Sequence, residues 1–285
     1  MKREQILERI RTFNNLPSFP SVVADVRDEL EGPDPAPRRI AHLIERDAGL
    51  TARIVALVSK SAYGQVPPSS LLQAVNRIGN RMLDEVVLTT AMMECFSRMR
   101  GFDQHRYWAH CVAVGLTARV VAERVPAEHA DALRQVYLGG LLHDLGAIVV
   151  GHRVPEMAKA VRERVAESGE PAYLVEQELF ALDHAEIGGL VGERIGLPEA
   201  CTVAARWHHD PWMAPEPSRI IAQVVHIADF VCCNQGYGRP GDGFHTRFDT
   251  GAWAVTGYSI DDVPEIIERV RQLALETERY LPAAA

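Results

Sequence analysis

Leu141-Leu142-His143-Asp144-Leu145-Gly146 sets an imidazole and a carboxylate side by side in an otherwise apolar stretch that runs from residue 136 to residue 150. Burying two adjacent polar side chains is unfavourable unless a partner satisfies them, and a metal ion is such a partner. The simpler alternative for an isolated His-Asp pair is a satisfied core histidine beside an aspartate that caps a helix. The rest of the chain has to distinguish these two interpretations.

Five further residues of ligand type lie in segments that are predicted to be helical, close to small or apolar residues. They are His110, His184, His208, His209 and Asp229. Together with His143 and Asp144 they make a complete ligand set for one or two divalent metal ions. Mixed imidazole and carboxylate ligands favour iron, manganese, zinc or nickel over magnesium and calcium.

Composition indicates a globular protein of the cytoplasm. The 285 residues are 47% hydrophobic, which is enough for one large domain or two small ones. No apolar run approaches the ~20 residues of a membrane span, and the start of the chain predicts an amphipathic helix rather than a signal peptide. The five cysteines have no CxxC spacing, which favours reduced thiols over a disulfide framework.

The charge argues against two classes of partner. The formal net charge is −8, and the acidic excess lies in residues 101–285, with the candidate metal ligands. Binding to nucleic acid or to an anionic membrane needs a basic face that neutralises phosphates. We therefore expect neither a nucleic-acid partner nor a membrane partner.

Apolar residues recur at helical spacing along the chain, and no period-2 strand pattern of any length occurs. An all-α protein is therefore predicted. Asp183 is expected to cap the helix that carries His184, and Gly146 is expected to be the left-handed residue after a helix that ends at the His-Asp pair. In the second half, we expect helices over residues 104–124, 130–145, 155–168, 173–182, 199–208 and 218–233, a long loop over 234–257, and a terminal helix over 261–280.

Seven short motifs follow one another in an order typical of one bacterial family. They read Leu16-Pro17-Ser18-Phe19-Pro20, Arg46-Asp47-Ala48-Gly49-Leu50-Thr51, Ser61-Ala62-Tyr63-Gly64, Ala74-Val75-Asn76-Arg77-Ile78-Gly79, Leu141-Leu142-His143-Asp144-Leu145-Gly146, Asp183-His184-Ala185-Glu186-Ile187-Gly188 and Trp207-His208-His209-Asp210-Pro211. On these motifs the chain resembles the HDOD family, the HD-related output domains of bacterial signalling proteins, to about residue 235. Lys60 departs from the family, which commonly has Asn at that position.

The resemblance implies a fold and a ligand assignment. It implies a helical N-terminal subdomain, residues 1–100, packed on an HD-like metal-binding helical core, residues 101–285. In the HD superfamily one metal is held by residues that match His110, His143, Asp144 and Asp229. Relatives that hold two metals, such as the HD-GYP phosphodiesterases, add histidines that match His184, His208 and His209, and the resemblance implies that Asp144 bridges the two ions.

Two departures disfavour the hydrolysis of cyclic dinucleotides. HD-GYP enzymes have a lysine shortly after the His-Asp pair, where this chain has Ala147. They also have a Gly-Tyr-Pro segment after the later histidines, where this chain has Asp210 and Pro211. Arg119 and Arg206 are candidates for the missing cation, but surface positions suit both of them better.

Three functional hypotheses remain open. The first is an HDOD signalling or regulatory module with a metal site, which acts through a protein partner or a homodimer. The second is a metal-dependent phosphohydrolase that acts on a nucleotide or another phosphoester. The third is a metal-free helical scaffold, and we rank it last because clustering these side chains without a metal costs desolvation and charge repulsion.

Overall fold

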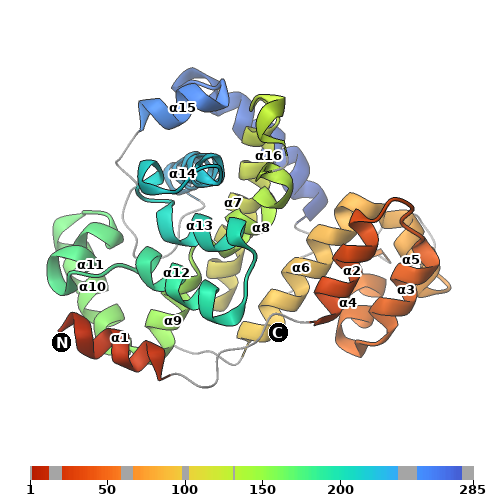
Figure 1. Ribbon diagram of the computed structural model, residues 1–285, viewed down its shortest axis with the longest axis horizontal. Coiled ribbons are helices and arrows are strands. Elements are labelled where there is room, and N and C mark those ends of the chain that lie inside the picture. Colours follow the sequence, from red (N-terminus) through yellow and green to blue (C-terminus); the bar gives the residue numbers. More distant parts are fainter. Residues whose placement is uncertain are drawn as a thin grey trace. The chain divides into compact units, whose positions relative to one another are not determined.

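The computed structural model describes residues 2–12, 21–58, 67–97, 103–130, 132–236 and 249–277. Every regular element in these ranges is a helix, and no strand occurs among them (Figure 1). The all-α prediction is therefore confirmed. Two of the motifs, at residues 16–20 and 61–64, and the departure at Lys60 lie outside the described residues.

The chain forms two compact units. The small unit comprises Pro17–Arg98 and Leu275–Ala285, and the large unit comprises Met1–Leu16 and Met99–Ala274. The helices of the small unit are α2 (Ser21–Glu31), α3 (Pro37–Glu45), α4 (Ala48–Val58), α5 (Leu71–Ile78) and α6 (Asn80–Phe96). Ser70 caps α5 by accepting a hydrogen bond from the backbone N–H of Gln73.

The large unit contains the candidate ligands and most of the remaining helices. Its α-helices are α1 (Arg3–Arg11), α7 (Gln104–Ala122), α8 (Val136–Leu142), α9 (Leu145–Arg153), α10 (Pro155–Ser168), α11 (Ala172–Phe180), α12 (His184–Ile195), α13 (Glu199–Trp207), α14 (Arg219–Asn234), α15 (Thr250–Thr256) and, up to Ala274, α16 (Val263–Thr277). Short 3₁₀ helices are η2 (Ala127–His129), η3 (Ala132–Gln135), η4 (Pro211–Met213) and η5 (Ile260–Asp262).

The first helix belongs by its contacts to the large unit, although the boundary predicted at residue 100 grouped it with the N-terminal subdomain. Helix α1 packs against α9 and α12. The Arg3 guanidinium pairs with Glu186, and the Arg194 guanidinium donates a hydrogen bond to the Ile10 carbonyl at 2.9 Å. Helix α1 is thus held by the same helices that surround the candidate site.

The core of the large unit is formed by α7, α8, α9, α12, α13 and α14, which pack against one another. All seven residues of α8 are buried. Helices α7 and α8 approach so closely that a Cβ on Gly140 would lie 2.7 Å from the Cα of Gly115. This close packing of α8 places the His143-Asp144 turn, which directly follows that helix, in the centre of the unit.

The helix predicted over residues 130–145 is divided, and the prediction for Gly146 is wrong. After η3 and α8 the chain turns at His143 and Asp144 and continues directly into α9, so that Gly146 is helical. Its lack of a side chain serves packing instead, because a Cβ there would lie 1.9 Å from the His184 carbonyl oxygen. Gly146 thereby lets α9 touch the start of α12.

The long loop predicted over residues 234–257 is also partly wrong. Residues 237–248 lie outside the described part of the chain, but Thr250–Thr256 form α15. Asp249 caps this helix by accepting hydrogen bonds from two backbone N–H groups, and Trp253 packs edge-on against Phe230 of α14. Burial of Trp253 and a good cap outweigh the glycine-rich surroundings.

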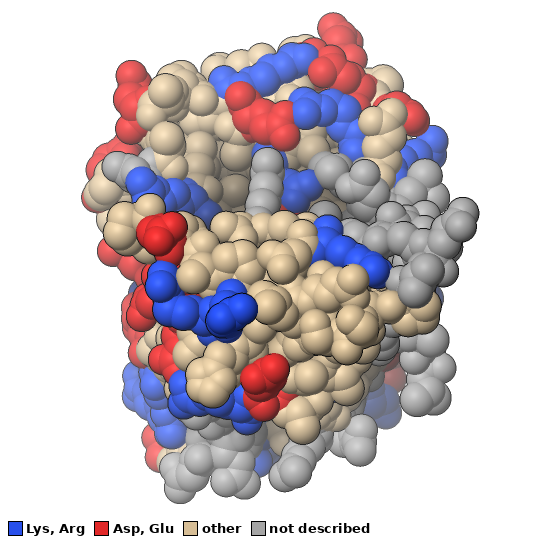
Figure 2. Space-filling model, turned by 90° about the vertical axis from the view of Figure 1, so that its right-hand side faces the viewer, with Lys and Arg blue, Asp and Glu red and all other residues tan. Residues whose placement is uncertain are grey.

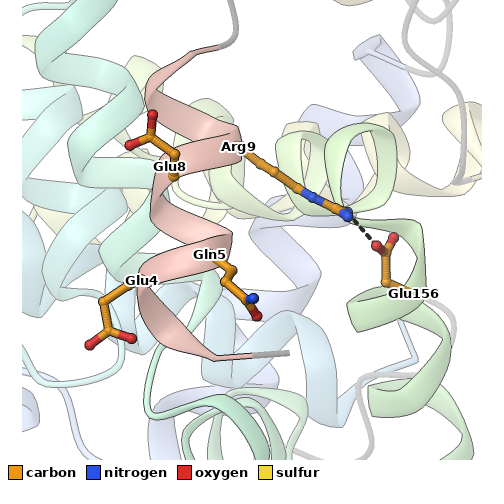
Figure 3. A pocket seen from close by; sticks show the side chains of 5 residues that line it. All are labelled: Glu4, Gln5, Glu8, Arg9 and Glu156. Carbon is orange, nitrogen blue, oxygen red and sulfur yellow. Dashed lines mark hydrogen bonds and ion pairs between the residues drawn. The ribbon is translucent and has the colours of Figure 1, made fainter.

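The surface carries both signs of charge. On the face in Figure 2, acidic and basic side chains are interspersed around a broad uncharged area. A hollow beside α1 and α10 is lined by Glu4, Gln5, Glu8, Arg9 and Glu156, and Arg9 pairs with Glu156 across it (Figure 3). None of the described helices combines the length and the apolar character needed to cross a bilayer.

Candidate metal centre

Five segments of the large unit bring the seven predicted ligands together. Helix α7 carries His110, the α8–α9 turn carries His143 and Asp144, and α12 begins with His184. The end of α13 is followed by His208 and His209, and α14 carries Asp229. Six of the seven side chains are buried, whereas His209 is half-buried.

The first donor group comprises His110, His143, Asp144 and Asp229. The Nε2 atoms of His110 and His143 lie 3.3 Å apart. Asp144 Oδ2 is 3.6 Å from His110 Nε2 and 3.5 Å from His143 Nε2. Asp229 Oδ1 lies 3.4 Å from His110 Nε2. Such separations are close to those between ligands of one tetrahedral ion, about 3.4 Å for bonds of roughly 2.1 Å.

The second donor group comprises His184, His208, His209 and the other oxygen of Asp144. His184 Nε2 lies 3.0 Å from His209 Nε2 and 3.2 Å from Asp144 Oδ1. Asp144 Oδ1 is 3.8 Å from His208 Nε2. One carboxylate thus faces both groups, with Oδ2 toward the first and Oδ1 toward the second.

Hydrogen bonds donated by Nδ1–H groups fix the orientation of three imidazoles. His143 Nδ1 donates to the Gly140 carbonyl at 2.7 Å, and His208 Nδ1 donates to the carbonyls of Ala204 and Ala205, each at 3.1 Å. His184 Nδ1 lies 2.7 Å from a carboxylate oxygen of Glu176. An Nδ1–H bonded to an acceptor leaves the Nε2 lone pair for a metal, which is how ligating histidines are usually held.

A buried nitrogen of His208 also supports the binding of a divalent metal by these donors. The Nε2 atom of His208 is buried and has no hydrogen-bond partner in the described part of the chain. A buried nitrogen left in this way is costly, whereas a metal would satisfy it. With its Nδ1 protonated, His208 offers the Nε2 lone pair toward Asp144 and the neighbouring imidazoles.

In the second donor group, the pKa values of His208 and His184 are shifted in opposite directions. Burial, reinforced by the neighbouring His143, lowers the pKa of His208 well below the usual histidine value, so this imidazole stays neutral. Burial also acts to lower the pKa of His184, but the carboxylates of Glu176 and Asp144 outweigh it and raise that pKa well above the usual value. Two carboxylates therefore make the His184 position attractive to positive charge.

Three residues that were not among the predicted ligands lie beside the donor groups. Buried Glu176 accepts hydrogen bonds from both the backbone and the ring of His184. Cys233 lies 3.3 Å from Asp229. Tyr173 stacks on His209 with ring centroids 4.0 Å apart. A carboxylate in the apolar stretch of α11 and the four-residue spacing of Asp229 and Cys233 were the available signals.

Two further residues, His226 and Arg206, lie around the donor groups rather than in them. His226 Nδ1 donates to the His208 carbonyl at 2.7 Å, so this histidine supports the turn after α13. Arg206 pairs with Glu193 at 3.0 Å. Because Arg206 is already paired with Glu193, it is a poor substitute for the phosphate-binding lysine of HD-GYP enzymes.

Comparison with solved structures shows the same fold in proteins from several bacteria. An HDOD domain protein of unknown function from Geobacter sulfurreducens is 27% identical, with a TM-score of 0.77, 97% of this chain covered and 96% of the other. A provisionally assigned signal transduction protein from Marinobacter aquaeolei VT8 is 20% identical, with a TM-score of 0.78, and the match covers 97% of this chain and 65% of the other.

A further solved structure and one curated protein are also similar to this chain. A provisionally assigned metal-dependent phosphohydrolase from Shewanella amazonensis SB2B shares the fold at 19% identity and a TM-score of 0.58, over 97% of both chains. An uncharacterized protein of Treponema pallidum (strain Nichols) is 26% identical over 218 residues, or 76% of this chain. The match covers only 42% of that curated relative.

The family model of the HDOD domain matches residues 16–211. This match includes the His143-Asp144 turn and the histidines of the second donor group, while Asp229 lies beyond it. Because the matched segment makes up more than half of the sequence, this chain belongs to the HDOD family.

Proposed function

We propose that this protein is an HDOD signalling or regulatory module built around a centre for one or two divalent metal ions. One observation carries the proposal, which is that the two carboxylate oxygens of Asp144 face two separate groups of imidazoles. His110, His143 and Asp229 would hold one ion, and His184, His208 and His209 would hold the other. The donor chemistry favours iron, manganese, zinc or nickel.

Metal content tests the centre directly. We expect protein purified anaerobically without chelator to contain metal, and His143→Ala and Asp144→Ala to lose it. His42→Ala is a suitable control, because His42 is 80% exposed in the small unit. Metal in the two site variants equal to that in the wild type would refute the ligand assignment. Wild-type protein that contains no metal would favour the third hypothesis, a metal-free helical scaffold.

The proposed regulatory role is exerted through a protein partner or a homodimer. The family membership and the signalling assignment of the Marinobacter structure support this role. Size-exclusion chromatography with light scattering, combined with an affinity pull-down from the native host, tests it. We expect a dimer or a specific associate, and a monomer that retains no associate would contradict the role.

A metal-dependent phosphohydrolase is the second candidate, favoured by the complete donor set. When bound, two ions of this kind lower the pKa of water and stabilise the charge of phosphoryl oxygens. His209 is the least buried of the seven ligands, so a phosphoester would have to approach the second donor group beside this residue. Ala147 and the ion pair of Arg206 with Glu193 disfavour this candidate, because neither position offers an unpaired cation for a phosphate.

A substrate panel separates the two functions. Metal-loaded protein is incubated with nucleotides, cyclic dinucleotides and a chromogenic phosphodiester, beside Asp144→Ala at equal metal concentration. Turnover that disappears in the variant would establish the phosphohydrolase. The signalling proposal predicts no turnover above that of the variant, and no hydrolysis of cyclic dinucleotides.

A further inference from the structure

Cys233 lies directly beside the first donor group. It is four residues after Asp229 on α14, so the two side chains project from the same face of the helix, one turn apart. Cys233 Sγ lies 3.3 Å from Asp229 Oδ1, which in turn lies 3.4 Å from His110 Nε2. A sulfur, an oxygen and a nitrogen donor are thus brought together.

The spacing of these donors suits a common ion. His110 Nε2, Asp229 Oδ1 and Cys233 Sγ all lie within 4.8 Å of one another. Neighbouring ligand atoms on one ion with bonds of roughly 2.0–2.3 Å lie about 3–3.5 Å apart. The two contacts through Asp229 match that separation. Cys233 would therefore join His110, His143, Asp144 and Asp229 as a fifth ligand of a five-coordinate ion.

The neighbouring cysteine has a different environment. Cys232 is buried against α7, where its Sγ lies 3.3 Å from the hydroxyl oxygen of Thr117. Burial raises the pKa of the Cys232 thiol to about 12, so this side chain remains a thiol in the core. Cys233 is half-buried and directed to Asp229. Adjacent cysteines on one helix therefore provide a test residue and a matched control.

We propose that Cys233 is a thiolate ligand of the metal in the first donor group. The inference rests on the proposed metal centre and deepens it. On binding, the S–H bond breaks, its electron pair forms the sulfur–metal bond, and the proton leaves to solvent. A thiolate is a soft ligand, so the first position favours zinc or ferrous iron over manganese and magnesium. The two positions then differ in the metal they prefer.

Cobalt(II) reports this sulfur bond spectroscopically. Full-length protein, stripped with a chelator and kept anaerobic, is titrated with Co²⁺ as wild type, Cys233→Ser and Cys232→Ser. We expect a near-ultraviolet thiolate-to-cobalt charge-transfer band in the wild type and in Cys232→Ser, and its loss in Cys233→Ser. We also expect affinity at this position to fall about tenfold or more in Cys233→Ser, at least as much as loss of an outer-shell partner costs.

The outcomes separate the sulfur ligand from the centre itself. Visible d–d bands without a charge-transfer band in the wild type would overturn the role of Cys233 and leave the metal centre intact. No cobalt binding at all would overturn both. If Cys233→Ser does not fold, alkylation of the wild-type protein followed by mass spectrometry tests whether Co²⁺ protects the Cys233 thiol. The proposal requires Co²⁺ to slow modification of Cys233, and an unchanged rate in cobalt-loaded protein would refute it.

Discussion

At the scale of single residues, the seven candidate ligands could be predicted because each one is a polar group in an apolar or small-residue context. The family motifs were also needed to select these seven, because His226 lies in an equally apolar context but supports a turn. The supporting residues could not be predicted in this way, because Glu176 reaches His184 only through the packing of α11 on the start of α12. The sequence of α11 does not specify that contact.

Removal of the Glu176 charge should weaken metal binding in the second donor group. Glu176→Gln removes the carboxylate that holds the Nδ1–H of His184, and we expect affinity there to fall about 10–100-fold, as for other second-shell partners. Competition with a chromophoric chelator measures the change. Glu178→Gln on the same helix is the control, since Glu178 pairs with exposed Arg164. Equal affinities in both variants would contradict this role of Glu176.

At the scale of helices, the sequence periodicity predicted the helical class and most helices but not the break between α8 and α9. Both helices are apolar, so periodicity continues through His143 and Asp144 without interruption. The turn exists because α9 must pack against α12 at Gly146, which is a tertiary requirement. Local pattern therefore located the ligand pair at a helix end but assigned Gly146 the wrong conformation.

Gly146→Ala tests the contact between α9 and α12. The added methyl would meet the His184 carbonyl at 1.9 Å, and backbone cannot yield as a side chain does. We expect a loss of about 3 kcal/mol or more in the free energy of unfolding, at the upper end for overpacking. Gly139→Ala is the control, with its nearest contact at 3.3 Å from the Ala204 methyl, and should cost about 1 kcal/mol. Equal costs in urea denaturation would contradict the close approach.

Asp262 makes a pH-dependent contribution to the stability of the folded protein at the start of α16. Hydrogen bonds from the Ser259 backbone and side chain, with the Arg124 guanidinium, lower the pKa of the Asp262 carboxyl. A lowered folded-state pKa stabilises the protein above the unfolded value, near 3.8, and this stabilisation is lost as the pH falls through the folded value.

Asp262→Asn should therefore lower the melting temperature at pH 7, and the difference from the wild type should shrink as the pH falls below about 4. Asp261→Asn removes the same charge from the neighbouring residue and is the control. Thermal unfolding followed by circular dichroism from pH 7 to pH 3 measures both. A difference that grows toward low pH would show that the ionised carboxyl is not what stabilises this helix start.

At the scale of the whole molecule, the order of the motifs predicted the family, because seven short patterns in one order are far more specific than any one of them. The grouping of α1 with the large unit could not be read from the sequence. It depends on contacts of Arg3 and Arg194 between residues more than 170 positions apart. The amphipathic pattern of α1 shows that one face of the helix is buried, but it does not show which helices bury that face.

Metal binding should stabilise one unit and not the other. All seven ligands belong to the large unit, and a ligand at about 100 times its Kd adds about 2.7 kcal/mol to a state that alone binds it. Hydrogen exchange should therefore slow in α7, α12 and α14 when Zn²⁺ is added to stripped protein. Helices α3 and α5 are the internal control. Equal slowing in the small unit would contradict a site confined to the large one.

Metal stoichiometry in three proteins tests whether the two donor groups share Asp144. We expect about two equivalents in the wild type, about one in His209→Ala, which lacks a ligand of the second group alone, and close to none in Asp144→Ala. Metal content in Asp144→Ala equal to that in His209→Ala would contradict a shared carboxylate, because Asp144 would then serve only one ion.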